Sequence, residues 1–111
     1  MKYNIEFYQD NKQKYPVSDF IKTVSAQEKA KIVWVIDLLE LTGPNITEPY
    51  AKHIEDKLWE LKPKGIRILY FMEKHTFILL HAFKKKTQKL PPHEKEIALK
   101  RMEVYLKRRK I

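Results

Sequence analysis

The chain has 111 residues, with 23 Lys and Arg against 14 Asp and Glu, a formal charge of +9 at pH 7, and no cysteine. Disulfide scaffolds, thiolate zinc sites and cysteine nucleophiles are therefore excluded, and a length of this size predicts one domain over residues 1–111. Because 43% of the residues are apolar and 12% aromatic, the high charge indicates a hydrated surface on a globular core and excludes a disordered chain.

The N-terminal part of the chain predicts a strand followed by a short helix. Lys2–Gln9 alternates between apolar and polar residues, as a strand with one buried face does. Pro16 suits the first turn of a helix, and apolar residues recur at helical spacing from Val17 to Val24.

A second helix is predicted directly after the first. Ser18 and Ser25 place hydroxyl groups where helices need caps, and Ser25 with Glu28 has the spacing of a capping box. Gly43-Pro44 is a typical helix stop. Trp34, which lies inside this helix, is expected in the core.

The second half of the chain predicts a meander and a last helix. After a loop over residues 45–56, strands are expected at Leu58–Lys62, Ile66–Met72 and Thr76–Phe83, and Pro91-Pro92 opens the C-terminal helix. The fold class is therefore α+β: an antiparallel sheet made of the N-terminal strand and a three-strand meander, with two N-terminal helices and one C-terminal helix.

The basic residues are concentrated near the C-terminus. Residues 84–111 contain 11 Lys and Arg against 3 Asp and Glu, whereas residues 1–83 contain 12 against 11. Such an uneven charge attracts polyanions, and nucleic acid is the first candidate partner, although a solvated lysine-rich helix explains the charge equally well. With no run of apolar residues typical of a signal peptide or a membrane span, we expect a cytoplasmic protein without membrane contact.

Metal and nucleotide chemistry are not indicated by the residue pattern. No two of the four histidines have the i, i+4 spacing of a zinc-binding helix, and the two glycines cannot form a phosphate loop, so we expect no metal and no cofactor. His81 is expected to share a strand face with Phe77, Leu79 and Phe83 and to serve structure. His53, in the predicted loop, is a secondary candidate for the site.

Cations on the predicted meander are the stronger candidates for chemistry. Arg67 lies in an apolar strand, where a guanidinium needs a partner, either Glu60 across the hairpin or a phosphate. After the last strand, a polar segment carries four lysines, a threonine and an amide at residues 84–89. Such a segment at a sheet edge is suited to an RNA backbone, while lysine runs are also common on ordinary surfaces. Tyr70 and Phe83 are expected in the core.

Three segments carry a resemblance to a known family: residues 49–56 (PYAKHIED), 58–71 (LWELKPKGIRILYF) and 79–91 (LLHAFKKKTQKLP). Together with the order of elements, they resemble the phage-derived branch of the RelE/HigB toxin superfamily. The resemblance implies the toxin of a type II toxin–antitoxin pair, a metal-independent endoribonuclease (mRNA interferase) that cleaves mRNA on the ribosome and leaves a cyclic phosphate. It also implies a cognate antitoxin, expected to be a HigA-like helix-turn-helix protein.

The resemblance also assigns roles to single residues. Arg67 matches the arginine expected to stabilise the transition state, Lys62 a basic residue for phosphate binding or proton transfer, and Lys85 the position nearest the active-site arginine of RelE-type members. Glu60 is either a base or the partner that orients Arg67. RNA binding is expected from five further residues: Lys84, Lys86, Gln88, Lys89 and Arg101. A tyrosine found near the C-terminus of several relatives has no clear counterpart, so the general base is unassigned.

Two other functions remain open at this point. A ParE-like toxin on the same fold would poison DNA gyrase without cutting RNA, and a noncatalytic module would only bind nucleic acid through its basic end. The set of cations on the meander favours RNA cleavage, because a gyrase poison needs no phosphate clamp on its sheet.

Overall fold

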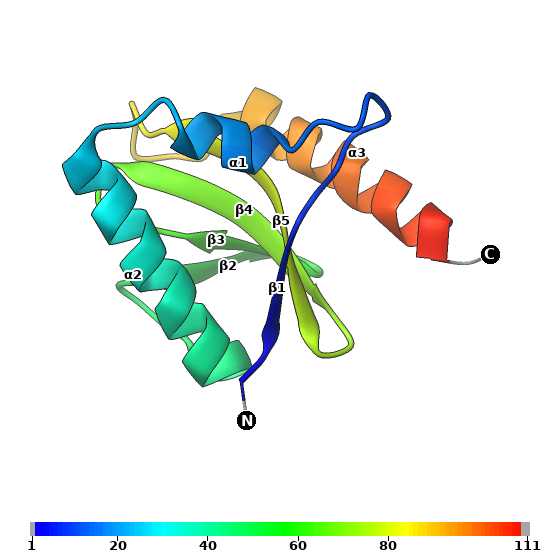
Figure 1. The fold of residues 1–111 in the computed structure, drawn as a ribbon, viewed down its shortest axis with the longest axis horizontal. Coiled ribbons are helices and arrows are strands. Elements are labelled where there is room, and N and C mark those ends of the chain that lie inside the picture. The colour runs from blue at the N-terminus through cyan, green and yellow to red at the C-terminus, as the bar shows by residue number, and fades with distance from the viewer. Residues whose placement is uncertain (1, 110–111) are drawn as a thin grey trace.

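The computed structural model describes residues 2–109, which form one sheet with helices on both faces (Figure 1). The elements follow in the order β1 (Asn4–Phe7), α1 (Pro16–Ile21), α2 (Ala26–Thr42), the 3-10 turn η1 (Gly43–Asn45), β2 (Ala51–Glu55), β3 (Leu58–Leu61), β4 (Ile66–Glu73), β5 (Thr76–Lys84) and α3 (Pro92–Arg109). No helix within the described residues has the length and apolar character needed to cross a membrane.

The α+β fold is confirmed, but the sheet is mixed. Its strand order is β1-β5-β4-β3-β2, and the four strands from β2 to β5 form an antiparallel meander. The edge strand β1 pairs parallel to β5, with Asn4 opposite Thr76. Alternation along β1 predicts a strand but carries no information about its direction. Because β1 and β5 are far apart in the chain, with the helices and the rest of the meander between them, a parallel pairing is possible.

The meander also has one strand more than the sequence predicted. β2 lies within residues 45–56, which were expected to form a loop, and pairs with β3 at the far edge of the sheet. Its register is irregular between His53 and Glu55, and both Lys52 and His53 are exposed. A short, polar and irregular edge strand lacks the apolar alternation that identifies strands in a sequence.

The predicted capping box of α2 is confirmed. Ser25 Oγ accepts a hydrogen bond from the backbone N–H of Glu28 (3.1 Å), and the Glu28 carboxylate accepts one from the backbone N–H of Ser25 (2.9 Å). The corresponding prediction for Ser18 is wrong, because α1 begins after Tyr15 and has no side-chain cap. Gly43 ends α2 with a positive φ of 59°, which a residue without a side chain adopts at no cost.

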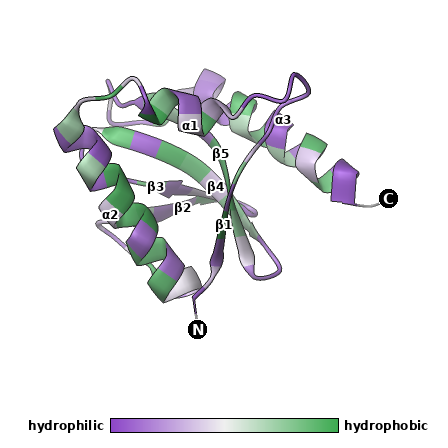
Figure 2. Ribbon diagram, viewed as in Figure 1, coloured by the Kyte–Doolittle hydropathy of each residue, from purple (hydrophilic) through white to green (hydrophobic). Residues whose placement is uncertain are grey.

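Two apolar clusters lie on opposite faces of the sheet. One joins α1 and α2 to alternate residues of β4 and β5, and the other joins α3 to the remaining residues of these strands, which are mostly hydrophobic in Figure 2. Tyr70 and Phe83 are buried as predicted. The prediction for Trp34 is wrong, because its side chain is 48% exposed. The apolar positions Ile32, Val35 and Leu39 of α2 are buried against the sheet, whereas Trp34 lies on the exposed side of the same helix, where apolar residues also occur.

Candidate functional site

A cationic pocket of about 140 Å³ opens at the edge of the sheet where β3 and β5 end and β4 begins. The cationic pocket is lined by Lys52, Glu60, Lys62, Arg67, Phe83 and the segment of residues 85–91 that leads from β5 to α3. Five lysines and one arginine thus surround a single carboxyl group. A concave surface with this excess of positive charge is suited to a polyanion.

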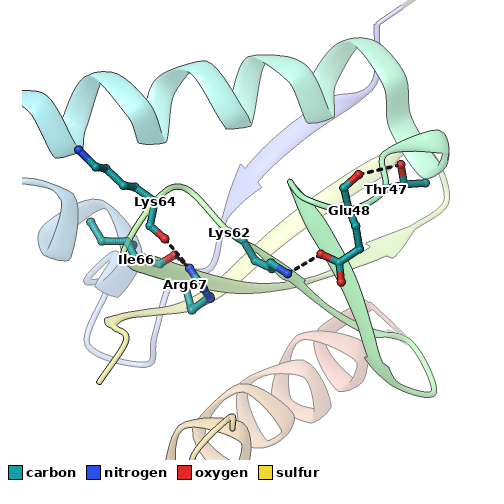
Figure 3. A network of polar contacts seen from close by, with 6 residues as sticks. All are labelled: Thr47, Glu48, Lys62, Lys64, Ile66 and Arg67. Carbon is teal, nitrogen blue, oxygen red and sulfur yellow. Dashed lines mark hydrogen bonds and ion pairs between the residues drawn. The ribbon is translucent and has the colours of Figure 1, made fainter. Parts of the chain in front are cut away.

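Arg67 is the buried cation of this pocket, with only 8% of its surface exposed. Its Nη1 donates hydrogen bonds to the backbone carbonyls of Lys64 (2.7 Å) and Ile66 (2.8 Å), as Figure 3 shows. The expected alternative, an ion pair with Glu60, is not formed among the described residues, although both side chains line the pocket. A guanidinium has five N–H donors, so Nη2 and Nε are left to bind an anion.

Glu60 is the only carboxyl group in the lining of the pocket, and it is as buried as Arg67. Burial raises the pKa of Glu60, whereas the positive charges of Arg67, Lys62, Lys52 and Lys85 lower it and only partly offset the effect of burial. A carboxylate with a raised pKa is a better proton acceptor than an exposed one. Glu60 can therefore exchange a proton with a group bound in the pocket.

Lys62 is held at the edge of the pocket by a carboxylate that sequence reasoning missed. Its Nζ donates to the carboxylate of Glu48 (Figure 3). Its backbone N–H donates to the carbonyl of Tyr50 at 2.8 Å. The hydrogen bond with Lys62 lowers the pKa of Glu48, whose side chain is 57% exposed. Glu48 thus occupies a position on Lys62 that a phosphate oxygen could take.

The segment of residues 85–91 forms the opposite wall. The backbone N–H of Lys85 donates to the carbonyl of Gly65 (2.8 Å), which ties this segment to the turn between β3 and β4. The Thr87 hydroxyl donates to the carbonyl of Lys89 (2.9 Å) and so shapes the segment locally. The bond between Lys85 and Gly65 brings residues that follow β5 next to residues that precede β4.

Seven of the nine site residues expected from the sequence line this one pocket: Glu60, Lys62, Arg67, Lys85, Lys86, Gln88 and Lys89. The other two lie elsewhere. The Lys84 ammonium points to Glu28 at 3.8 Å, and Arg101 donates to the carbonyl of Leu80 (2.8 Å) on the α3 side of the sheet. Sequence reasoning missed Lys52, which lies opposite Glu60 on β2, because its segment was expected to be a loop.

His81 and His53 lie outside the pocket lining. The register of β4 and β5 shifts near Leu80, so that His81 faces α3, where its Nε2 contacts Glu94 (2.6 Å) and its Nδ1 accepts from Arg101 (3.2 Å). The expected common face with Phe77 and Leu79 is therefore wrong, since these two lie in the other cluster. Burial lowers the pKa of His81. The His53 Nε2 lies 2.7 Å from the carbonyl oxygen of Asp56.

Solved structures with a similar fold include two of RelE toxins. An archaeal RelE from a RelE–RelB complex of Pyrococcus horikoshii OT3 aligns with a TM-score of 0.60 and 14% identity, over 80% of this chain and 100% of the RelE chain. The isolated E. coli RelE toxin aligns with a TM-score of 0.54 and 15% identity, over 90% and 98% of the two chains. No curated protein sequence matches this chain. Residues 19–103 match the model of the family described as phage derived protein Gp49-like.

The match covers most of the chain and includes every element from α2 to β5 as well as the whole lining of the cationic pocket. The chain therefore belongs to the phage-derived Gp49-like family, a family of RelE-like toxins, as its sequence resemblance predicted.

Proposed function

We propose that this protein is the toxin of a type II toxin–antitoxin pair and acts as a metal-independent, ribosome-dependent mRNA endonuclease in the cytoplasm. The family and the fold support a toxin of this kind. The observation that carries the cleavage activity is the cationic pocket, where six cations surround one buried carboxyl group. When the 2′-hydroxyl of RNA attacks the neighbouring phosphate, cleavage requires a group that accepts the hydroxyl proton and positive charges placed around the phosphate.

The proposed reaction uses three residues of the pocket. Glu60 removes the proton of the 2′-hydroxyl as its oxygen attacks the neighbouring phosphorus, and the free N–H groups of Arg67 stabilise the charge on the phosphoryl oxygens. The bond to the 5′-oxygen breaks, and Lys85 protonates that oxygen. The products are a 2′,3′-cyclic phosphate and a 5′-hydroxyl, so protons and charge balance without a cofactor.

Lys62 and the lysines of the segment 85–91 bind the phosphates on either side of the scissile one. Before RNA binds, Glu48 neutralises Lys62. An incoming phosphate replaces this exposed carboxylate, so the ion pair keeps Lys62 positioned without closing the pocket.

Cleavage is tested by adding the purified protein to a cell-free translation system and mapping the ends of a reporter mRNA. New ends that carry a cyclic phosphate, formed only during translation, are expected for the wild type, and Lys85→Ala should reduce them by about 100-fold or more, since positioned general acids contribute roughly 100-fold to 10,000-fold. Lys22→Ala is the matched control, because the Lys22 side chain is 74% exposed, forms an ion pair with Asp19 and lies outside the pocket lining.

Other results would contradict the proposal. Intact mRNA together with inhibited DNA supercoiling would favour a ParE-like gyrase poison. Binding of RNA that weakens with salt, without cleavage and without growth arrest on expression, would favour a noncatalytic module.

The proposed partner is a cognate antitoxin, expected to be a HigA-like helix-turn-helix protein. The archaeal RelE that shares this fold was solved as a complex with RelB. Growth arrest on expression should be relieved by co-expression of the antitoxin, and the two proteins should elute together. Arrest that no candidate antitoxin relieves would contradict this assignment.

A further inference from the structure

Trp34 is an exposed tryptophan that lies outside the lining of the cationic pocket. It lies on the side of α2 that faces away from the buried residues Ile32 and Val35, and its side chain is 48% exposed. The indole ring contacts the ring of Tyr50 at 5.4 Å, tilted by 60°, and the Lys31 ammonium lies 5.0 Å from its centroid. A large aromatic ring is thus held in place at the surface next to an ammonium group.

The ring forms part of an open hollow on the molecular surface. Its lining is Gln27, Ala30, Lys31, Trp34 and Lys64, with two lysines and no carboxylate. We call this surface the tryptophan hollow. An apolar protein segment would have to desolvate both ammonium groups here, whereas an RNA strand brings phosphates that pair with them.

A single turn connects the tryptophan hollow to the cationic pocket. Lys64 lies in the turn between β3 and β4, and in Figure 3 its side chain extends toward α2 while its carbonyl accepts the hydrogen bond from Arg67. Lys62, at the start of the same turn, lines the cationic pocket. An RNA strand that followed this turn out of the cationic pocket would meet Lys64, which lines the tryptophan hollow together with Trp34.

Single-stranded RNA is commonly bound by this combination of groups. Lysines follow the backbone while aromatic rings stack on bases, and one stacked base strengthens binding by roughly 5-fold to 150-fold. The Lys31 side chain is long and flexible, so its ammonium can leave the ring face and pair with a phosphate when a base arrives.

We propose that the tryptophan hollow is a base-stacking subsite for a nucleotide that flanks the scissile phosphate. Trp34 stacks on the base, and Lys31 and Lys64 bind the adjoining phosphates. This inference rests on the proposed function, because it takes the RNA in the cationic pocket as its ligand.

The direct test uses Trp34 as its own reporter. The chain has two tryptophans, so Trp59→Phe leaves Trp34 as the only one. The probe is a short, fluorescein-labelled single-stranded RNA with 2′-O-methyl groups throughout, which the proposed reaction cannot cleave. We expect the RNA to quench Trp34 emission with the same midpoint as the rise in anisotropy of the probe.

Substitutions in the tryptophan hollow should weaken binding in a graded way. In the natural background, Trp34→Leu should lower affinity about 10-fold, and Trp34→Phe should restore much of it, because a phenyl ring still stacks. Lys64→Ala should reduce the slope of affinity against salt by about 0.7, the value for one phosphate contact in a single strand. Leu41→Ala is the matched control, since Leu41 is exposed on the same helix and lies outside the hollow.

Three other outcomes would overturn the inference, and they also show whether the proposed function is wrong. If anisotropy rises without quenching, or if Trp34→Leu binds and cleaves RNA like the wild type while Lys85→Ala does not cleave, only the stacking subsite is wrong. If the probe does not bind and translating mRNA stays intact, both proposals are wrong. If Trp34→Leu binds RNA normally but escapes the antitoxin, the hollow belongs to a protein partner and the RNA subsite is refuted.

Discussion

Arg67 is expected to stabilise the fold as well as to act in the pocket. Its Nη1 donates to the carbonyls of Lys64 and Ile66, and the hydrogen bond to Ile66 is buried. A hydrogen bond from a charged donor contributes about 1.5–3 kcal/mol. Because both bonds share one nitrogen and water can reach the exposed Lys64, we count a single bond, so Arg67→Ala should lower the free energy of unfolding by about 2 kcal/mol.

For a domain of this size, a loss of about 2 kcal/mol lowers Tm by roughly 9 °C. The measurement is thermal unfolding followed by circular dichroism, with urea unfolding at one temperature as a second estimate. Arg67→Lys should lie between the wild type and Arg67→Ala, since an ammonium can donate to one carbonyl but lacks the planar fork. Lys85→Ala should unfold within about 0.5 kcal/mol of the wild type, because its side chain is not buried.

A Tm of Arg67→Ala within about 2 °C of the wild type would refute this reasoning, because a buried carbonyl that loses its hydrogen-bond donor lowers the free energy of unfolding. The result also governs how activity is measured. Cleavage by Arg67→Ala has to be assayed well below its own Tm, where lost activity reports on the reaction and not on unfolding.

Three further predictions concern stability. Gly43→Ala should cost about 2 kcal/mol or more in urea unfolding, because φ is 59° and a methyl group would clash with the ring of Tyr3, whereas Gly65→Ala, with open space around it, should stay within about 0.5 kcal/mol. Ser25→Ala should cost about 1 kcal/mol, and equal costs for Ser25→Ala and Ser18→Ala would contradict the assigned cap. Burial lowers the pKa of His81 below its ordinary 6.5, so unfolded chains bind a proton more readily and stability should fall as pH drops below about 6.5, by at most about 1.4 kcal/mol per pH unit. Urea unfolding of His81→Gln over the same pH range should not show this loss of stability, and identical pH profiles for the variant and the wild type would show that His81 is not responsible.

Most of the cationic pocket could be predicted because it is built from neighbouring parts of the chain. Glu60, Lys62, Arg67 and Lys85 lie within one meander whose apolar strands and short turns are unmistakable in the sequence. An antiparallel meander necessarily brings the end of one strand next to the start of the following strand. The resemblance to RelE-like toxins then named the residues that those strand ends carry.

The parts that sequence reasoning missed depend on contacts that leave no local pattern. Glu48 reaches Lys62 from a segment before an irregular edge strand, and Lys52 belongs to that strand. His81 changes face because the register of β5 shifts by one residue, which reverses the alternation beyond that point. Trp34 is exposed because it lies off the apolar stripe of α2 that packs against the sheet, and its aromatic character alone did not show that it stays at the surface.

The parallel pairing of β1 with β5 sets an order of events during synthesis. Residues of β1 leave the ribosome before those of the other strands, but Asn4 and Phe7 pair with Thr76 and Leu79, which are made much later. Until then β1 has no partner, whereas β2, β3 and β4 can pair with their neighbours as they emerge, because short loops close quickly. The nascent toxin therefore has an interval in which an unpaired β1 is open to other strands. A truncated product that stops before β5 would leave β1 without its partner strand and would lack the part of the pocket lining that Lys85 begins.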